Sequence, residues 1–159
     1  MSSPKRTSAR PSSAGILAYR RVSHSLEVLL VHPGGPYWRN KDNGAWSIPK
    51  GEIGTSEDPE QTARREFTEE LGPAASIGHL QALGEIRQRG GKRVIAFCEE
   101  TDFDTSLLSS NTFEIEWPPK SGRLQPIPEI DRAEWFALPP ARAKILASQQ
   151  PLLDRLEML

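Results

Sequence analysis

The chain has 159 residues and nearly balanced charge, with 20 Lys and Arg against 21 Asp and Glu. This length suits one domain with a real core, and the charge balance gives no bulk attraction to nucleic acid or to an anionic membrane. No apolar run is long enough to span a bilayer, and a single cysteine excludes an internal disulfide. We therefore expect a cytoplasmic protein with one domain over residues 14–159.

Residues 1–13 are polar and basic and lack the apolar segment of a secretory signal. We expect a flexible tail there, with a mitochondrial targeting role as the alternative. Apolar-rich runs at 14–22 and 26–32 then predict two strands joined by a short polar turn. Residues 37–44 (YWRNKDNG) form a polar loop with aromatic side chains, and the apolar run at 46–49 closes in a Pro-Lys-Gly turn.

The run 58–71 predicts an amphipathic helix. Ser56 is the expected N-cap, Pro59 suits the first turn, and Gly72 followed by Pro73 is a stop signal. The apolar stripe of this helix consists of Ala63, Phe67 and Leu71. We expect the stripe to face the core.

The second half of the chain predicts further strands and two short helical segments. Residues 81–89 and 92–99 flank Gly90-Gly91 and predict a hairpin. The stretch 103–129 is long and Pro-rich, with a strand-like FEIEW in its middle. The remaining predicted elements are a last strand at 134–137 and helices at 140–147 and 152–158. This alternation indicates a mixed α/β fold.

Four glutamates, Glu57, Glu66, Glu69 and Glu70, are spaced to converge on one side of the helix and the loop before it. Like charges repel, so such a cluster is typical of divalent-cation binding. The alternative is an ordinary helix with a solvated acidic side. The preceding turn favours a cation site, because Gly51 would let a backbone carbonyl turn toward the carboxylates.

This pattern resembles the Nudix hydrolase family, whose box reads Gly, five residues, Glu, seven residues, Arg-Glu-apolar-any-Glu-Glu-any-Gly-apolar. The matching positions are Gly51, Glu57, Arg65, Glu66, Phe67, Glu69, Glu70 and Gly72. Pro73 departs from the pattern, where the family usually has an aliphatic residue. The resemblance implies an α/β/α sandwich with a mixed β-sheet. It also implies hydrolysis of a pyrophosphate bond in a nucleoside diphosphate linked to another group.

The resemblance further implies roles for these side chains. Glu69, Glu70 and the Gly51 carbonyl look like principal ligands of Mg²⁺, with Mn²⁺ as the alternative ion. Glu66 looks like a further ligand or the general base. Glu57 would act through water or other residues, and Arg65 would orient Glu57 and Glu69.

Many family members add a carboxylate from the loop before the last strand. Glu129 is our candidate for this extra ligand or base, and Glu134 is the second choice. A solvated loop acid is the alternative. Glu100 and Asp102 are weaker candidates.

Substrate contacts are expected from Lys50, Arg87, Arg89 and Trp38. The two arginines alternate along one predicted strand, and Trp38 lies in a polar loop where it can stack on a base. Solvated surface charge is the alternative for the basic residues. Trp46 is expected to pack, and Trp117 to form a lid or pocket rim.

The sequence features that distinguish substrate subgroups of this family are mostly absent here. ADP-ribose hydrolases tend to carry a proline after the box, but none lies between Pro73 and Pro118 here, and both tyrosines, Tyr19 and Tyr37, precede the box. The lead-in WSIPKGE looks like that of MutT-type or dinucleoside polyphosphate hydrolases. We therefore favour an NTP or a dinucleoside polyphosphate as substrate.

Two alternatives stay open. One is an RNA 5′-end pyrophosphohydrolase, for which near-neutral charge gives no support; we expect a small nucleotide partner and neither nucleic acid nor membrane. The other is a domain that senses a nucleotide without turnover, which the presence of all the box glutamates disfavours. The sequence leaves the oligomeric state open.

Overall fold

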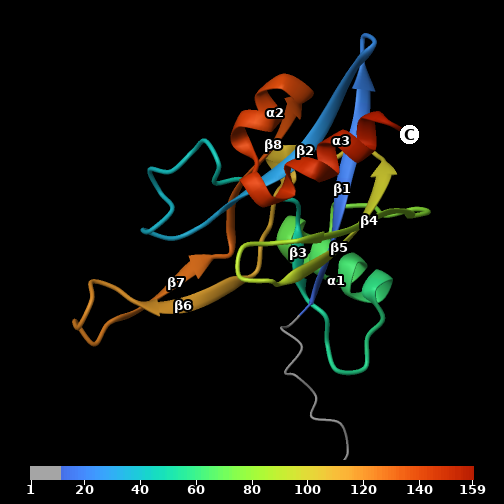
Figure 1. Ribbon diagram of the computed structural model, residues 1–159. Helices are drawn as coiled ribbons and strands as arrows, with labels where there is room; N and C mark the ends of the chain where they lie inside the picture. Colours follow the sequence, from blue (N-terminus) through green and yellow to red (C-terminus); the bar gives the residue numbers. More distant parts are fainter. Residues whose placement is uncertain (1–11) are drawn as a thin grey trace, which may run out of the picture.

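A mixed β-sheet forms the centre of the computed structural model, which describes residues 12–159 (Figure 1). Its strands, in spatial order, are β4 (Gln81–Arg87), β5 (Arg93–Glu100), β1 (Ser13–Val22), β2 (Ser25–Pro33) and β8 (Ile130–Ala137), with the short β3 (Lys50–Glu52) paired to β1. β1 and β5 run parallel, and the other pairs are antiparallel. Most of the expected tail lies outside the described residues, and Ser13 already belongs to β1.

Helices cover both faces of this sheet (Figure 1). One face packs against α1 (Pro59–Leu71), and the other packs against α2 (Leu138–Lys144) and α3 (Gln150–Glu157). Alternation along β1 separates the two cores, because Ile16 faces α1 while Leu17 faces the opposite side. The expected α/β/α sandwich is confirmed. No helix of residues 12–159 is long and apolar enough to cross a membrane.

The box helix has the expected end and a different start. Gly72 follows its last residue with φ of 99°, a conformation that glycine adopts without steric cost. The N-cap is Asp58 and not the expected Ser56. The Asp58 side chain accepts a hydrogen bond from the backbone N–H of Gln61, and the Gln61 side chain accepts one from the backbone N–H of Asp58. Pro59 explains the shift, because a residue before proline is held in extended backbone and cannot be helical.

The expected hairpin between β4 and β5 is confirmed, and Gly90 and Gly91 both have positive φ in its turn. Three other elements begin earlier than expected. β8 begins at Ile130 instead of Glu134 and pairs with β2 over its whole length, although polar residues interrupt its apolar pattern. The last two helices each begin two residues earlier than expected, since proline suits a first helical turn. Two single 3₁₀ turns complete the elements, η1 (Thr105–Leu107) and η2 (Ala147–Gln149).

The Pro-rich stretch holds a hairpin of which only half was expected. β6 (Thr112–Glu116) matches the FEIEW segment, and it pairs with β7 (Leu124–Pro128) as a separate two-stranded sheet. The hairpin stands away from the main sheet (Figure 1). β7 reads LQPIP, and its two prolines hid it as a strand. Proline is tolerated there because β7 is an edge strand.

The box loop lies inside the sheet and not at its rim. β1 pairs with β2 only from Tyr19 onward, and the first half of β1 pairs with β3 instead. Segment 46–52 fills the opening, with Ile16 N–H donating to the Pro49 carbonyl at 3.1 Å. A Cβ at Gly15 would lie 2.5 Å from that carbonyl oxygen, so only glycine permits this approach. The insertion brings the Pro-Lys-Gly turn against α1.

Candidate active site

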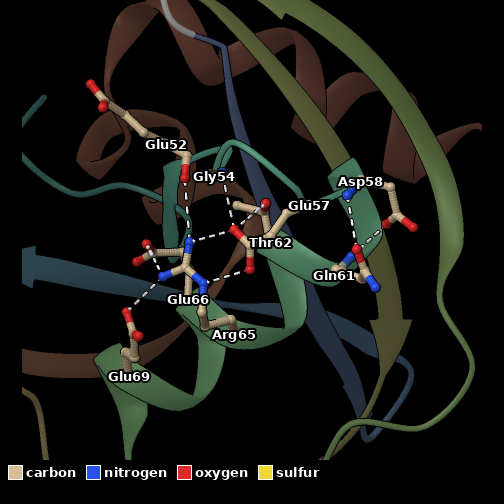
Figure 2. A network of polar contacts seen from close by, with 9 residues as sticks. All are labelled: Glu52, Gly54, Glu57, Asp58, Gln61, Thr62, Arg65, Glu66 and Glu69. Atoms are coloured by element: carbon tan, nitrogen blue, oxygen red, sulfur yellow. Dashed lines mark hydrogen bonds and ion pairs between the residues drawn. The ribbon is translucent and has the colours of Figure 1, made fainter.

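Arg65 is the centre of a carboxylate network that joins the box loop to α1 (Figure 2). Its Nε and Nη2 each donate to Glu57 at 2.8 Å. Its Nη1 donates to Glu66 at 3.0 Å and to Glu69 at 3.1 Å. The geometry therefore contains the contacts expected of Arg65 and adds one to Glu66.

Glu57 holds the loop in place. Besides Arg65, it accepts hydrogen bonds from the Gly54 backbone N–H and the Thr62 hydroxyl, both at 3.0 Å (Figure 2). The Arg65 guanidinium in particular lowers the pKa of Glu57 to about 2. Glu57 is thus an ionised anchor at neutral pH, and its four contacts leave it pointing at protein groups.

Glu70 lies deeper than the sequence indicated. We expected the acidic face to lie away from the packed face, but Glu70 is only 7% exposed. Its carboxylate accepts a hydrogen bond from the Lys50 backbone N–H at 3.2 Å. Burial, and next the charge of Glu66, raise the pKa of Glu70 to about 8. The site therefore contains a buried carboxylate that accepts a hydrogen bond from the backbone and forms no salt bridge with any of residues 12–159.

A cavity of about 480 Å³ opens beside these carboxylates. Glu70, Lys50 and Glu129 line it together, so a loop far along the chain reaches the box residues. Burial, and then the charge of Glu69, raise the pKa of Glu129, while burial lowers the pKa of Lys50. The lining also includes apolar and aromatic side chains, among them Trp38, Ile48 and Phe113. One pocket thus combines acidic groups, one half-buried lysine and aromatic surface.

Comparison with known proteins places this arrangement in a family. The NUDIX domain model matches residues 9–156, almost the whole chain. The chain belongs to the Nudix family. The expected enzyme class, a pyrophosphohydrolase, is confirmed at that level. No curated protein matches the sequence.

Solved structures confirm the Nudix fold. An Ap4A hydrolase of C. elegans in a binary complex superposes with a TM-score of 0.63 at 22% identity, covering 92% of this chain and 96% of that one. The NUDIX domain of Shewanella oneidensis NrtR, complexed with ADP ribose, gives 0.66 at 18% identity, covering 99% and 92%. MutT, studied from Aliivibrio salmonicida and Vibrio cholerae, gives 0.55 at 15% identity, covering 94% and 98%. At these identities the likeness concerns the fold.

Nudix hydrolases generally use divalent metal ions. The oxygen donors of this site are suited to such an ion. Glu66, Glu69, Glu70 and Glu129 offer carboxylate oxygens, which Mg²⁺ and Mn²⁺ prefer. Burial, and next the repulsion between neighbouring carboxylates, raise the pKa values of Glu66 and Glu70, and a cation among them would offset both effects. Within residues 12–159, no three His, Cys, Asp or Glu side chains are already arranged as a metal site. Two of these carboxylates, Glu66 and Glu69, turn to Arg65 instead.

The other expected residues fall into two groups. Trp38 lines the cavity, as a substrate contact would. Arg87 ends β4, exposed and across from Arg93, and Arg89 lies in the turn that follows; neither lines the cavity beside Glu70. The structure thus does not place either arginine in the wall of this cavity.

The weaker acidic candidates also lie elsewhere. Glu134 is exposed on β8 opposite Leu30. Asp102 pairs with Arg20 at 2.8 Å, and Glu100 lies opposite Tyr19 at the end of β5. Among the candidates outside the box, Glu129 is the one beside Glu70.

His32 has a structural role that the sequence pattern did not reveal. It is fully buried, with Nδ1 2.8 Å from an Asp131 oxygen and Nε2 2.7 Å from the Lys41 carbonyl oxygen. A carbonyl can only accept, so Nε2 carries a proton. The ring ties β8 to the loop that carries Trp38. In the sequence, the signal for this role was that His32 is a polar residue within an otherwise apolar strand.

Gly51 is the tightest point of the site. A Cβ there would lie 2.0 Å from the Glu66 carboxyl carbon. We expect Gly51→Ala to push the Glu66 carboxylate aside and to lower kcat/KM about 100-fold, since a shift of about 1 Å in a catalytic group has that scale of effect. Steady-state kinetics with thermal unfolding as a folding control measure this. Full activity in the folded variant would show that Glu66 has no fixed position in catalysis.

Proposed function

We propose that the chain hydrolyses a pyrophosphate bond in an NTP or a dinucleoside polyphosphate, with Mg²⁺. The observation that carries this proposal is the single cavity shared by Glu70, Glu129, Lys50 and Trp38. A pyrophosphate is polyanionic and a nucleobase is flat and apolar, so a ligand with both parts matches the two ends of this wall. The proposal includes a single domain over residues 14–159 that acts in the cytoplasm.

At the acidic end, we assign the cation to Glu66, Glu69, Glu70, Glu129 and the Gly51 carbonyl. When bound, Mg²⁺ supplies positive charge that neutralises the pyrophosphate. Lys50 supplies further positive charge, because an arriving phosphate favours the ammonium form that burial disfavours. Arg65 and Glu57 orient the helix and loop carboxylates through the network in Figure 2.

Two carboxylates are candidates for the general base that takes a proton from water. Burial, and next the charge of Glu69, raise the pKa of both Glu66 and Glu129 above the ordinary value for glutamate. A raised pKa makes the ionised carboxylate a stronger base. Both groups also lie at the site, Glu66 against Gly51 and Glu129 in the cavity wall.

At the aromatic end, Trp38 provides a ring for base stacking, which contributes roughly 1–3 kcal/mol per base in nucleic-acid sites. Phe113 lines the same cavity. Trp46, the other tryptophan near the box, is buried in the core and unavailable to a ligand. This division matches the sequence expectation that Trp46 packs.

Phosphate and pyrophosphate release across a substrate panel tests the proposal. The panel contains NTPs, dinucleoside polyphosphates, ADP-ribose, nucleotide sugars and 5′-triphosphate RNA. We expect turnover of an NTP or a dinucleoside polyphosphate that a chelator abolishes and added Mg²⁺ restores. A preference for 5′-triphosphate RNA, or turnover that survives the chelator, would contradict the proposal.

A further inference from the structure

A second cavity, of about 400 Å³, lies next to the one beside Glu70. It opens between the loop 34–38 and the β6–β7 hairpin, and we call it the distal cavity. Its walls are aromatic, with Tyr37 and Trp38 from the loop and Phe113 and Trp117 from the hairpin. Trp38 and Phe113 also line the first cavity, so the two share a wall. Among the residues that the structure describes, no charged side chain lines the distal cavity.

The hairpin is fixed to the acidic site at its base. The backbone N–H of Asn111 donates to the Glu69 carbonyl at 2.9 Å, and that of Glu129 donates to the Asn111 carbonyl at 2.8 Å. The Gly34 N–H donates to the Glu129 carbonyl at 2.9 Å. These hydrogen bonds therefore fix both walls of the distal cavity in position relative to the end of α1.

Gly34 brings the two walls close together. A Cβ at Gly34 would lie 2.0 Å from the Pro128 carbonyl oxygen, so the loop and the hairpin meet backbone to backbone. The fold keeps a glycine where any side chain would separate them. The position of the distal cavity is thus set by backbone packing between the loop and the hairpin.

The aromatic rings of the distal cavity are unusually open to solvent. Tyr37 is 69% exposed, Phe113 41% and Trp117 39%. Rings of this size are normally buried, and a cluster of exposed ones around a hollow marks a binding surface. Tyr37 and Trp38 meet edge to face at 5.0 Å, and the Lys41 ammonium lies 3.8 Å from the Tyr37 ring centroid. These contacts hold the two loop rings in place before any ligand arrives.

We propose that the distal cavity is a second subsite, which takes a planar aromatic ring from the group attached beyond the cleaved pyrophosphate. This inference rests on the proposed function. An NTP carries one ring, which fills only one of the two cavities. A polyphosphate with a ring at each end fills both, with Trp38 between them. The uncharged lining suits a neutral ring such as a nucleobase and disfavours a free phosphate.

The test compares two substrates with equal phosphate numbers, diadenosine tetraphosphate and adenosine 5′-tetraphosphate. We expect kcat/KM to be about tenfold higher for the two-ring substrate, on the scale of one stacking interaction. Tyr37→Ala and Trp117→Ala, which remove rings that line the distal cavity and not the first one, should bring this ratio close to one. Leu124→Ala is the matched control, because Leu124 is an exposed residue of the same hairpin that lines neither cavity, and it should keep the ratio.

A binding measurement separates this inference from the proposed function. Calorimetric Kd values for both nucleotides are measured with Mg²⁺ on Glu69→Gln, alone and combined with Tyr37→Ala. A tenfold preference for the two-ring ligand that Tyr37→Ala removes would support the subsite even if the unaltered protein hydrolysed neither nucleotide. Equal affinities, or a Tyr37→Ala loss of the same size for both ligands, would overturn the subsite and leave the proposed hydrolysis standing.

Discussion

Glu69→Gln is expected to lower kcat/KM for the preferred nucleotide by at least about 100-fold while the protein stays folded. Even residues that only support a metal ligand contribute about 10- to 100-fold, and we assign Glu69 as a ligand itself. Gln keeps the size of the side chain and can still accept the hydrogen bond from Arg65, which Glu69 accepts at 3.1 Å. It removes the negative charge that a cation requires. Steady-state kinetics with Mg²⁺ and a thermal unfolding curve measure the two effects.

Glu60→Gln is the matched control for this experiment. Glu60 lies on the same helix and pairs with Arg64 at 3.1 Å, an i,i+4 contact like that of Glu69 with Arg65. It lies in the first turn and does not line the cavity. We expect full activity there. Mn²⁺ binding, followed by calorimetry, should weaken in Glu69→Gln and not in Glu60→Gln; unchanged Mn²⁺ affinity and activity in Glu69→Gln would remove Glu69 from the metal site.

The box residues and their helix were predictable, because the spacing of residues along the helix determines which side chains share a face. Glu66, Glu69 and Glu70 share a helix face by period alone, and Arg65 reaches Glu69 by the same i,i+4 rule. The depth of Glu70 was not predictable in this way. Its burial depends on the Pro-Lys-Gly turn being inserted between β1 and β2, which is a tertiary event.

Contacts across long stretches of chain explain the other differences. Glu129 could be proposed only through the family resemblance, and its place depends on the backbone bond of Gly34 to its carbonyl. The distal cavity could not be predicted, because β7 has two prolines and no apolar alternation. Trp117 was expected to form a lid or rim, and the structure places it in the cavity wall opposite Tyr37.

Phe67→Ala is expected to lower the free energy of unfolding by about 3–5 kcal/mol, the usual cost of removing a buried aromatic side chain. Phe67 is 1% exposed and belongs to the core between α1 and the sheet, with Ile16 and Leu29. Truncation leaves a cavity that the rigid sheet cannot fill. Urea titration at constant temperature measures the change, and the melting temperature should fall by roughly 10 °C.

Leu107→Ala is the control for this stability experiment, because Leu107 is 53% exposed and a surface change stays within about 0.5 kcal/mol.

Phe67 and Glu69 are two residues apart on one helix, yet their substitutions should affect different measurements. Phe67→Ala should unfold the domain at lower urea, and Glu69→Gln should abolish turnover without that shift. A loss below about 1 kcal/mol for Phe67→Ala would mean that α1 is not held through its apolar stripe. The acidic face would then need another support, and the Arg65–Glu57 contact is the one that the structure offers.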